Sequence, residues 1–232
     1  ALTPNFLPSS GPSPFSISNF TQTTPQCTMV FSTTHLNYNS SIIIMIYKHN
    51  FFIITGGPGA GKTTLLETLA KQGFPYVPEV AREIIREQVS QNGDALPWAN
   101  IPAYIHLMLS RSVESFEQHQ KQESVLFFDR GIPDTLAYAH LIHQPILPKL
   151  QHAVQDFRYN PLVFILPPWP EIYQTDSERK QSYQEAVATY DITLVTYQQL
   201  DYTPIIVPKG SPKERANFVI DTLNQTKVTV VR

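Results

Sequence analysis

The chain has 232 residues, of which 42% are apolar, and its formal net charge is −2. This length suits one large domain or two small ones, with enough apolar residues to bury a sizeable core. The small net charge and the lack of a dense Lys/Arg run argue against nucleic acid or an anionic membrane as the main partner. We therefore expect no nucleic-acid partner.

No stretch of the sequence reaches the roughly 18 apolar residues that a transmembrane helix needs, so we expect no membrane span. The sequence contains one cysteine, Cys27, and therefore allows no internal disulfide. A reducing compartment fits this cysteine usage, and we expect a cytoplasmic location.

Residues 1–46 differ in composition from the rest of the chain. No Asp, Glu, Lys or Arg occurs before Lys48, and Ser, Thr, Asn and Pro are frequent. The basic start and apolar block of a secretory signal are absent, as are the arginines of a transit peptide. We interpret residues 1–46 as a disordered extension or an over-called start, because Met45 lies shortly before the first strong strand pattern; a real but flexible tail is the alternative. The folded domain is then expected over residues 47–226.

A short apolar run over residues 51–54 leads into the pattern G-x-x-x-x-G-K-[ST], and a helical pattern follows it. In such a P-loop, glycines let backbone N–H groups close on phosphate oxygens, and the helix N-terminus adds partial positive charge. Lys62 would supply a cation for the β- and γ-phosphates, and Thr63 a hydroxyl for Mg²⁺. The residues expected to bind nucleotide are Gly56, Gly57, Pro58, Gly59, Ala60, Gly61, Lys62, Thr63 and Thr64. We therefore expect the chain to bind a nucleoside triphosphate, with ATP and Mg²⁺ as cofactors.

The rest of the chain alternates between strand and helix patterns. Further strands are predicted over 74–78, 124–128, 162–166 and 204–207, and helices over 79–91, 101–121, 134–142, 147–157, 181–200 and 212–223. Such alternation is typical of an α/β fold with a parallel sheet and helices on both of its faces.

Asp129 follows four apolar residues, at the end of a predicted buried strand. Open α/β sheets place their ligands at the carboxyl ends of the strands, so this carboxylate is a candidate Walker-B ligand of Mg²⁺ or a catalytic group. The alternative is that Asp129 caps the helix that comes next.

Glu79 follows the second predicted strand and shares a helix face with Arg82 and Arg86 by spacing. One hypothesis is that Glu79 orients or deprotonates an acceptor hydroxyl while Arg82 holds an anion. The alternative is a solvated face of ion pairs between residues three apart, Glu79–Arg82 and Glu83–Arg86.

The polar stretch after the fourth strand carries Arg179, within Asp176-Ser177-Glu178-Arg179-Lys180. An arginine on a mobile segment can close over phosphates and stabilise the charge of a phosphoryl-transfer transition state. The alternative is an ordinary charged start of a helix.

Four segments together resemble the AAA-type predicted ATPases, which are grouped with the kinase domain of NadR-type ribosylnicotinamide kinases. They are the P-loop block 52–64, Pro-Glu-Val-Ala-Arg-Glu at 78–83, Phe-Phe-Asp-Arg-Gly at 127–131 and Leu-Pro-Pro-Trp-Pro-Glu-Ile-Tyr at 166–173. The resemblance covers about residues 47–223. It implies a three-layer P-loop NTPase with five parallel strands in the order 2-3-1-4-5.

The resemblance also implies roles for single residues. Asp129-Arg130 matches the Asp-Arg that ends the third strand of related kinases, and Arg130 joins Glu79 and Arg82 as a candidate substrate-binding residue. Glu79 matches a carboxylate that serves the acceptor, and Arg179 matches an arginine of the lid. Residues 207–210 match a segment that lines the nucleobase.

Two functions follow from these observations. The first is Mg²⁺-dependent phosphoryl transfer from ATP to an unidentified small-molecule acceptor, with Lys62, Asp129, Glu79 and Arg179 as catalytic residues. The second is a slow ATPase or GTPase that acts as a nucleotide-dependent switch or binding module with a protein or lipid partner. A kinase needs an acceptor pocket and a closing lid, and a switch needs neither, so Glu79, Arg82 and Arg179 discriminate between the two functions. The sequence contains no Asn-Lys-x-Asp motif that would indicate guanine selectivity.

Overall fold

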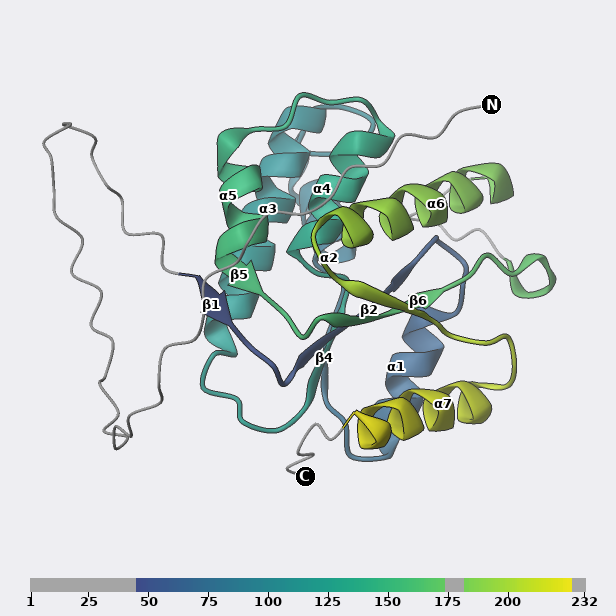
Figure 1. Ribbon diagram of the computed structural model, residues 1–232. Helices are drawn as coiled ribbons and strands as arrows, with labels where there is room; N and C mark the ends of the chain where they lie inside the picture. Colours follow the sequence, from purple (N-terminus) through teal and green to yellow (C-terminus); the bar gives the residue numbers. More distant parts are fainter. Residues whose placement is uncertain (1–44, 174–181, 227–232) are drawn as a thin grey trace, which may run out of the picture. The chain divides into compact units, whose positions relative to one another are not determined.

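A computed structural model describes residues 45–173 and 182–226 (Figure 1). Its strands are β1 (Ile46–Tyr47), β2 (Phe51–Gly56), β3 (Tyr76–Val77), β4 (Leu126–Asp129), β5 (Phe157–Arg158), β6 (Leu162–Leu166) and β7 (Thr203–Ile206). Its α-helices are α1 (Lys62–Lys71), α2 (Val80–Gln91), α3 (Ile101–Gln118), α4 (Ile132–Leu141), α5 (Pro148–Asp156), α6 (Tyr183–Gln199) and α7 (Pro212–Gln225), and a short 3-10 helix spans Pro170–Ile172.

The main sheet has five parallel strands in the order β3-β4-β2-β6-β7. Numbered by their sequence in the chain, these strands stand in the order 2-3-1-4-5. The predicted α/β class, with a parallel sheet flanked by helices, is confirmed. β1 and β5 form a separate two-stranded parallel pair that the sequence did not predict, since two-residue strands show no periodicity.

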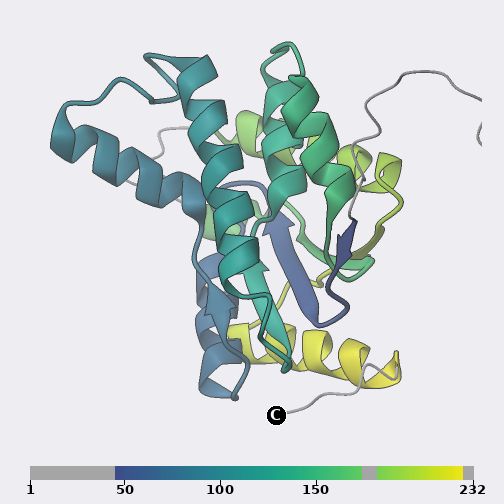
Figure 2. The ribbon, with the colours of Figure 1, turned by 90° about the vertical axis from the view of Figure 1, so that its left-hand side faces the viewer.

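Strand β2 is buried on both faces, which explains its uninterrupted apolar run. Phe51 and Ile53 pack into a cluster with side chains of α3, α4, α5 and α6. Phe52 and Ile54 point the other way, into a cluster with side chains of α1 and α7. Alternate residues of a strand face opposite sides of its sheet, so each set serves one core. Figures 1 and 2 show α1 and α7 on one side of the sheet and the remaining helices on the other.

Proline and capping residues set the element boundaries that differ from the predictions. The strand expected over 74–78 is reduced to Tyr76–Val77, because Pro75 and Pro78 cannot donate to a ladder. Helix α6 begins after Ser182, whose side chain accepts the backbone N–H of Glu185. Within the described residues, no helix has the length and apolar character needed to cross a membrane.

Gly56 joins β2 to the P-loop at a point of very close backbone approach. Its φ is +136°, and a Cβ atom there would lie 2.4 Å from the carbonyl oxygen of Leu166 on β6. Gly73, at φ +92°, has open space around the equivalent position. A side chain at either glycine would strain the backbone, but only a side chain at Gly56 would also clash with neighbouring atoms. Comparing the two positions therefore distinguishes backbone strain from steric clash.

We predict that Gly56→Ala lowers the melting temperature more than Gly73→Ala does. Backbone strain at a positive φ should cost each variant about 1 kcal/mol or more, which lowers the melting temperature of a domain of this size by about 2–4 °C. The clash with β6 should add about 1–3 kcal/mol in Gly56→Ala alone. Thermal unfolding followed by circular dichroism measures both. Equal shifts would contradict the close approach of β2 and β6.

Candidate functional site

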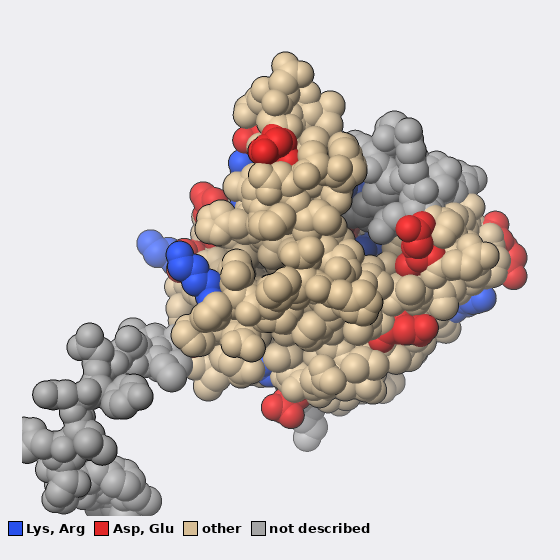
Figure 3. Space-filling view, turned by 90° about the horizontal axis from the view of Figure 1, so that it is seen from above, with Lys and Arg blue, Asp and Glu red and all other residues tan. Residues whose placement is uncertain are grey.

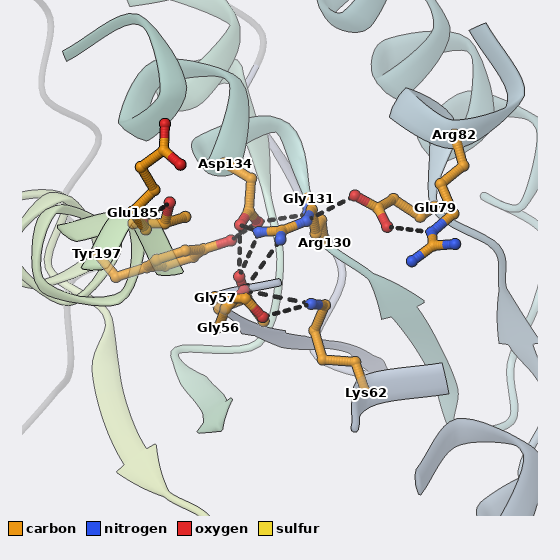
Figure 4. A network of polar contacts seen from close by, with 12 residues as sticks. Gly56, Gly57, Lys62, Glu79, Arg82, Arg130, Gly131, Asp134, Glu185 and Tyr197 are labelled. Carbon is orange, nitrogen blue, oxygen red and sulfur yellow. Dashed lines mark hydrogen bonds and ion pairs between the residues drawn. The ribbon is translucent and has the colours of Figure 1, made fainter. Parts of the chain in front are cut away.

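The P-loop connects β2 to α1 and holds its lysine against its own backbone. Gly61, with φ +80°, precedes the first residue of α1 in the left-handed conformation that glycine adopts most readily. The Nζ atom of Lys62 donates to the carbonyl oxygens of Gly56 at 3.3 Å and Gly57 at 3.1 Å (Figure 4). Thr63, in the first turn of α1, is exposed. The predicted nucleotide-binding residues therefore run from the end of β2 through the loop and into the first turn of α1.

Asp129 ends β4 beside the strand that leads into the P-loop. Asp129 is opposite Ile54 of β2 in the parallel register, and it is 6% exposed. The capping alternative is wrong, because Gly131 is the N-cap of α4 and its N–H is accepted by the carboxylate of Asp134. The position at the carboxyl end of the sheet is the one expected of a Walker-B carboxylate.

Glu79 is buried at the start of α2, and its carboxylate contacts two arginines, Arg130 and Arg82. Its Oε1 atom accepts from Nε of Arg130 at 2.8 Å, and its Oε2 atom from Nε of Arg82 at 3.3 Å. The Glu79–Arg82 pair predicted by spacing therefore exists, but Glu79 itself is only 4% exposed. A solvated surface face is consequently the wrong description of Glu79, since buried carboxylates are held by paired charges.

Arg130 links Glu79 to the P-loop. Its Nη2 atom donates to the carbonyl oxygen of Gly56 at 2.9 Å, and its Nη1 atom to Oδ1 of Asp134 at 3.0 Å. Burial opposes the charged form, but the carboxylates of Glu79, Asp134 and Asp129 outweigh it and raise the pKa of Arg130 above its ordinary value. Its φ of +72° is unusual for a residue with a side chain. Figure 4 shows the guanidinium between the two carboxylates.

Asp134 is a residue of the site that the sequence reasoning missed. Its carboxylate accepts from Arg130, from the hydroxyl of Thr55, from the N–H of Gly131 at 2.8 Å and from the hydroxyl of Tyr197 at 2.5 Å. Burial, together with the nearby Asp134 carboxylate, raises the pKa of Tyr197 well above its ordinary value, so this hydroxyl keeps its proton and donates it. The only sequence signal was an acid in the first turn of the helix after Asp129.

Arg215 of α7 is a second missed residue. It is 4% exposed, and its Nη2 atom donates to the carbonyl oxygen of Ala60 in the P-loop at 3.0 Å. Its guanidinium carbon lies 5.7 Å from the ring centroid of Trp169, which belongs to the Pro-Pro-Trp-Pro-Glu block. Burial lowers its pKa. Arg215 therefore connects Trp169 of the segment 166–173 to the P-loop.

Arg179 lies outside the described residues, and its predicted role stays a prediction. The residues on either side of the undescribed segment are in contact: the rings of Tyr173 and Tyr183 meet edge to face, with centroids 5.5 Å apart. Tyr173 also covers the P-loop, because a Cβ atom on Gly59 would lie 2.6 Å from its ring. Tyr173, which comes just before the undescribed residues, therefore lies at the nucleotide loop, and Tyr183, which follows them, contacts Tyr173.

A cavity of about 980 Å³ adjoins the P-loop and brings the candidate acceptor residues together. Pro58 of the P-loop, Glu79, Arg130 and Asp134 line it, as do residues of α2, α3, α4 and α6. The cavity is large enough for a small-molecule ligand, since such sites usually measure about 300–1,000 Å³.

The predicted magnesium ligands are compatible with that ion in their chemistry. Thr63 and Asp129 offer a hydroxyl and a carboxylate, the hard oxygen ligands that Mg²⁺ prefers. Among the described residues, no group of three or more His, Cys, Asp and Glu side chains could hold a metal ion. Magnesium in P-loop sites usually shares its coordination with substrate phosphates, so two protein ligands suffice.

Comparisons with known proteins agree with this arrangement. A family model described as an AAA domain matches residues 51–215. A search of curated proteins found no match. Among solved structures, a NadR protein in complex with NR is 18% identical with a TM-score of 0.60, and the alignment covers 78% of this chain and 52% of that one.

Two kinase structures also match over nearly their whole length. Thymidylate kinase from Candida albicans is 16% identical with a TM-score of 0.57, covering 76% of this chain and 92% of that one. Deoxyadenosine kinase from M. mycoides with bound dATP is 14% identical with a TM-score of 0.54, covering 75% and 99%. At such identities the likeness concerns the fold, and the chain spans about half the length of the NadR structure. By the family match, its P-loop and its parallel sheet, the chain belongs to the AAA domain family of P-loop NTPases and has a nucleoside/nucleotide-kinase-like fold.

Proposed function

We propose that the chain transfers the γ-phosphoryl group of ATP to a hydroxyl of a small molecule, in a Mg²⁺-dependent reaction. The observation that carries this proposal is the chain of contacts from Gly56 of the P-loop through Arg130 to Glu79 at the wall of the cavity. A kinase must align a bound nucleotide with a bound acceptor. The nucleotide loop would hold the first, and the cavity with its buried carboxylate would hold the second.

On the nucleotide side, the P-loop backbone would hold the phosphates and Lys62 would leave the carbonyl oxygens of Gly56 and Gly57 to contact them. Thr63 and Asp129 would hold Mg²⁺, which neutralises charge on the phosphate oxygens when it is bound. Arg179 would add positive charge as the phosphoryl group moves.

On the acceptor side, Glu79 would accept a hydrogen bond from the reacting hydroxyl and so direct its oxygen towards the γ-phosphorus. Arg130 and Arg82 hold one carboxylate oxygen each, which fixes the direction of the remaining lone pairs. The hydroxyl oxygen forms a bond to phosphorus, the bond to the β–γ bridging oxygen breaks, ADP leaves, and the hydroxyl proton passes to Glu79.

A nucleotide switch is the second candidate, and the structure offers it less support. A switch needs the P-loop but has no use for a buried carboxylate at the wall of a cavity of about 980 Å³. ATP turnover that depends on an added small molecule separates the two functions.

We predict that Asp129→Asn weakens Mg²⁺–ATP binding by about tenfold or more while binding of ATP in the presence of a chelator changes little. The amide keeps the shape of the side chain and removes the charge that would attract the ion. Calorimetry with and without Mg²⁺ measures both affinities, with Lys62→Ala as a control that should weaken both. Equal losses in the two conditions for Asp129→Asn would contradict a metal-binding role.

We predict that Glu79→Gln lowers kcat for transfer by about 10²–10⁴-fold, the usual range for one acid–base group. KM for ATP should change little, because Glu79 is on the acceptor side of the P-loop. The matched control is Glu83→Gln, an exposed position on the same helix, which should behave like the parent. Steady-state kinetics with an active acceptor, and thermal unfolding to verify the fold, complete the test. A Glu79→Gln rate within twofold of the parent rate would remove Glu79 from the mechanism.

A further inference from the structure

The carboxylate of Asp134 is held by four donors from different parts of the fold. Its Oδ2 atom accepts from the N–H of Gly131 at 2.8 Å and from the hydroxyl of Tyr197 at 2.5 Å. Its Oδ1 atom accepts from Nη1 of Arg130 at 3.0 Å and from the hydroxyl of Thr55. A carboxylate has about four lone-pair sites, so one donor is present for each of them. The position and the plane of this carboxylate are therefore fixed.

Asp134 in turn sets the direction of the Arg130 side chain. The guanidinium is planar, and it donates through Nη1 to Asp134 and through Nε to Glu79, at 2.8 Å. Because its N–H groups point in fixed directions, a bond from Nη1 to a fixed carboxylate determines where Nε points. The orientation of Asp134 therefore reaches Glu79 through Arg130.

Tyr197 belongs to α6, a helix that also lies against the P-loop. Its side chain is fully buried, and its ring packs edge to face on the ring of Tyr202, with centroids 5.3 Å apart. Earlier on the same helix, the carbonyl oxygen of Ala186 would lie 2.4 Å from a Cβ atom on Gly57. Figure 4 shows the Tyr197 ring pointing from α6 towards Asp134. The helix that supplies the hydroxyl is thus held in place by the nucleotide loop itself.

This network concentrates charge inside the protein. On the face seen in Figure 3, the charged side chains form only small, separate groups. Glu79 and Asp134, in contrast, are 4% and 5% exposed, and both line the cavity beside the P-loop together with Arg130. Burying such groups is costly unless they are paired and hydrogen-bonded, and a network whose members are satisfied stiffens its surroundings. The network therefore keeps its members in one arrangement at the wall of the cavity.

We propose that Tyr197 is a positioning residue that acts on Glu79. Its hydroxyl fixes the carboxylate of Asp134, which fixes the guanidinium of Arg130. The guanidinium then directs Glu79 at the acceptor hydroxyl. This inference rests on the proposed function for the role of Glu79. A purely structural hydrogen bond, in contrast, would contribute to stability and leave the transfer rate unchanged.

Two tyrosine variants separate positioning from stability. Tyr197→Phe removes the hydroxyl and keeps the ring. Tyr202→Phe is the matched control, because Tyr202 is also buried and its hydroxyl accepts the N–H of Tyr159, at 3.4 Å. Thermal unfolding of both variants shows how much stability each lost hydroxyl contributed.

Steady-state kinetics then measure the effect on transfer. The acceptor used is the alcohol that most stimulates ADP release from Mg²⁺–ATP, chosen from a panel of nucleosides, vitamins and sugars. A misplacement of about 1 Å can cost about 10²-fold in rate, and we expect the loss of one donor in four to lower kcat less, by about tenfold. KM for ATP should stay within about twofold of the parent value, and Tyr202→Phe should keep the parent kcat. A kcat of Tyr197→Phe within twofold of that of Tyr202→Phe would overturn the inference.

A double-mutant cycle in urea tests the same connection without an acceptor. Tyr197→Phe is combined with Glu79→Gln, and the control cycle combines Tyr202→Phe with Glu79→Gln. If Tyr197 acts on Glu79, the unfolding equilibrium constant of the first double variant should differ by more than about twofold from the value expected of independent effects. The control pair should agree with that value to within about twofold. Independent effects in the first cycle would contradict the connection.

The two tests distinguish this inference from the proposed function. If no alcohol stimulates ADP release, the proposed transfer fails, and the cycle alone decides whether Tyr197 acts on Glu79. If transfer occurs and Tyr197→Phe behaves like its control, the proposed function stands and the positioning role fails.

Discussion

The structure depends on one buried cation, the guanidinium of Arg130. It donates to the carbonyl oxygen of Gly56 in the P-loop, to Asp134 at the start of α4 and to Glu79 at the start of α2. Three segments that are far apart in the sequence are thereby held at one edge of the sheet. Removing one partner of a buried charge network usually costs more than the pair itself contributes, because the remaining charge is left in a poor environment.

The same carbonyl oxygen of Gly56 accepts from both Arg130, at 2.9 Å, and Lys62, at 3.3 Å. A nucleotide that draws Lys62 onto its phosphates would leave this oxygen to Arg130 alone. The guanidinium is planar and can direct its donors in fixed directions, which suits it to keep Glu79 in place while the lysine moves. The nucleotide loop and the carboxylate of Glu79 are therefore connected through a planar group, as the proposed transfer between two aligned substrates would require.

Local patterns predicted most of the fold and part of the site. The P-loop, the buried strands β2, β4 and β6 and the carboxylate of Asp129 each follow from a few neighbouring residues. Asp134 and Arg215 do not, because their contacts are distant in sequence: Asp134 meets Thr55 across 79 positions and Arg215 meets Ala60 across 155. The burial of Glu79 could not be predicted either, since its partner Arg130 lies 51 positions away, in the turn between β4 and α4. Spacing on one helix shows Arg82 as its neighbour but cannot show what covers the helix.

Arg130 and Glu79 act as one buried unit, and a double-mutant cycle tests this coupling most directly. The free energies of unfolding of Arg130→Met, Glu79→Gln and the double variant would be measured in urea. Methionine is as unfavourable as arginine at the positive φ of residue 130, so the substitution leaves the backbone strain unchanged. We expect Arg130→Met to destabilise the fold by about 3–5 kcal/mol and the double variant to be more stable than the sum of the single effects by about 1–3 kcal/mol. Single effects that add to within about 0.5 kcal/mol would contradict the account.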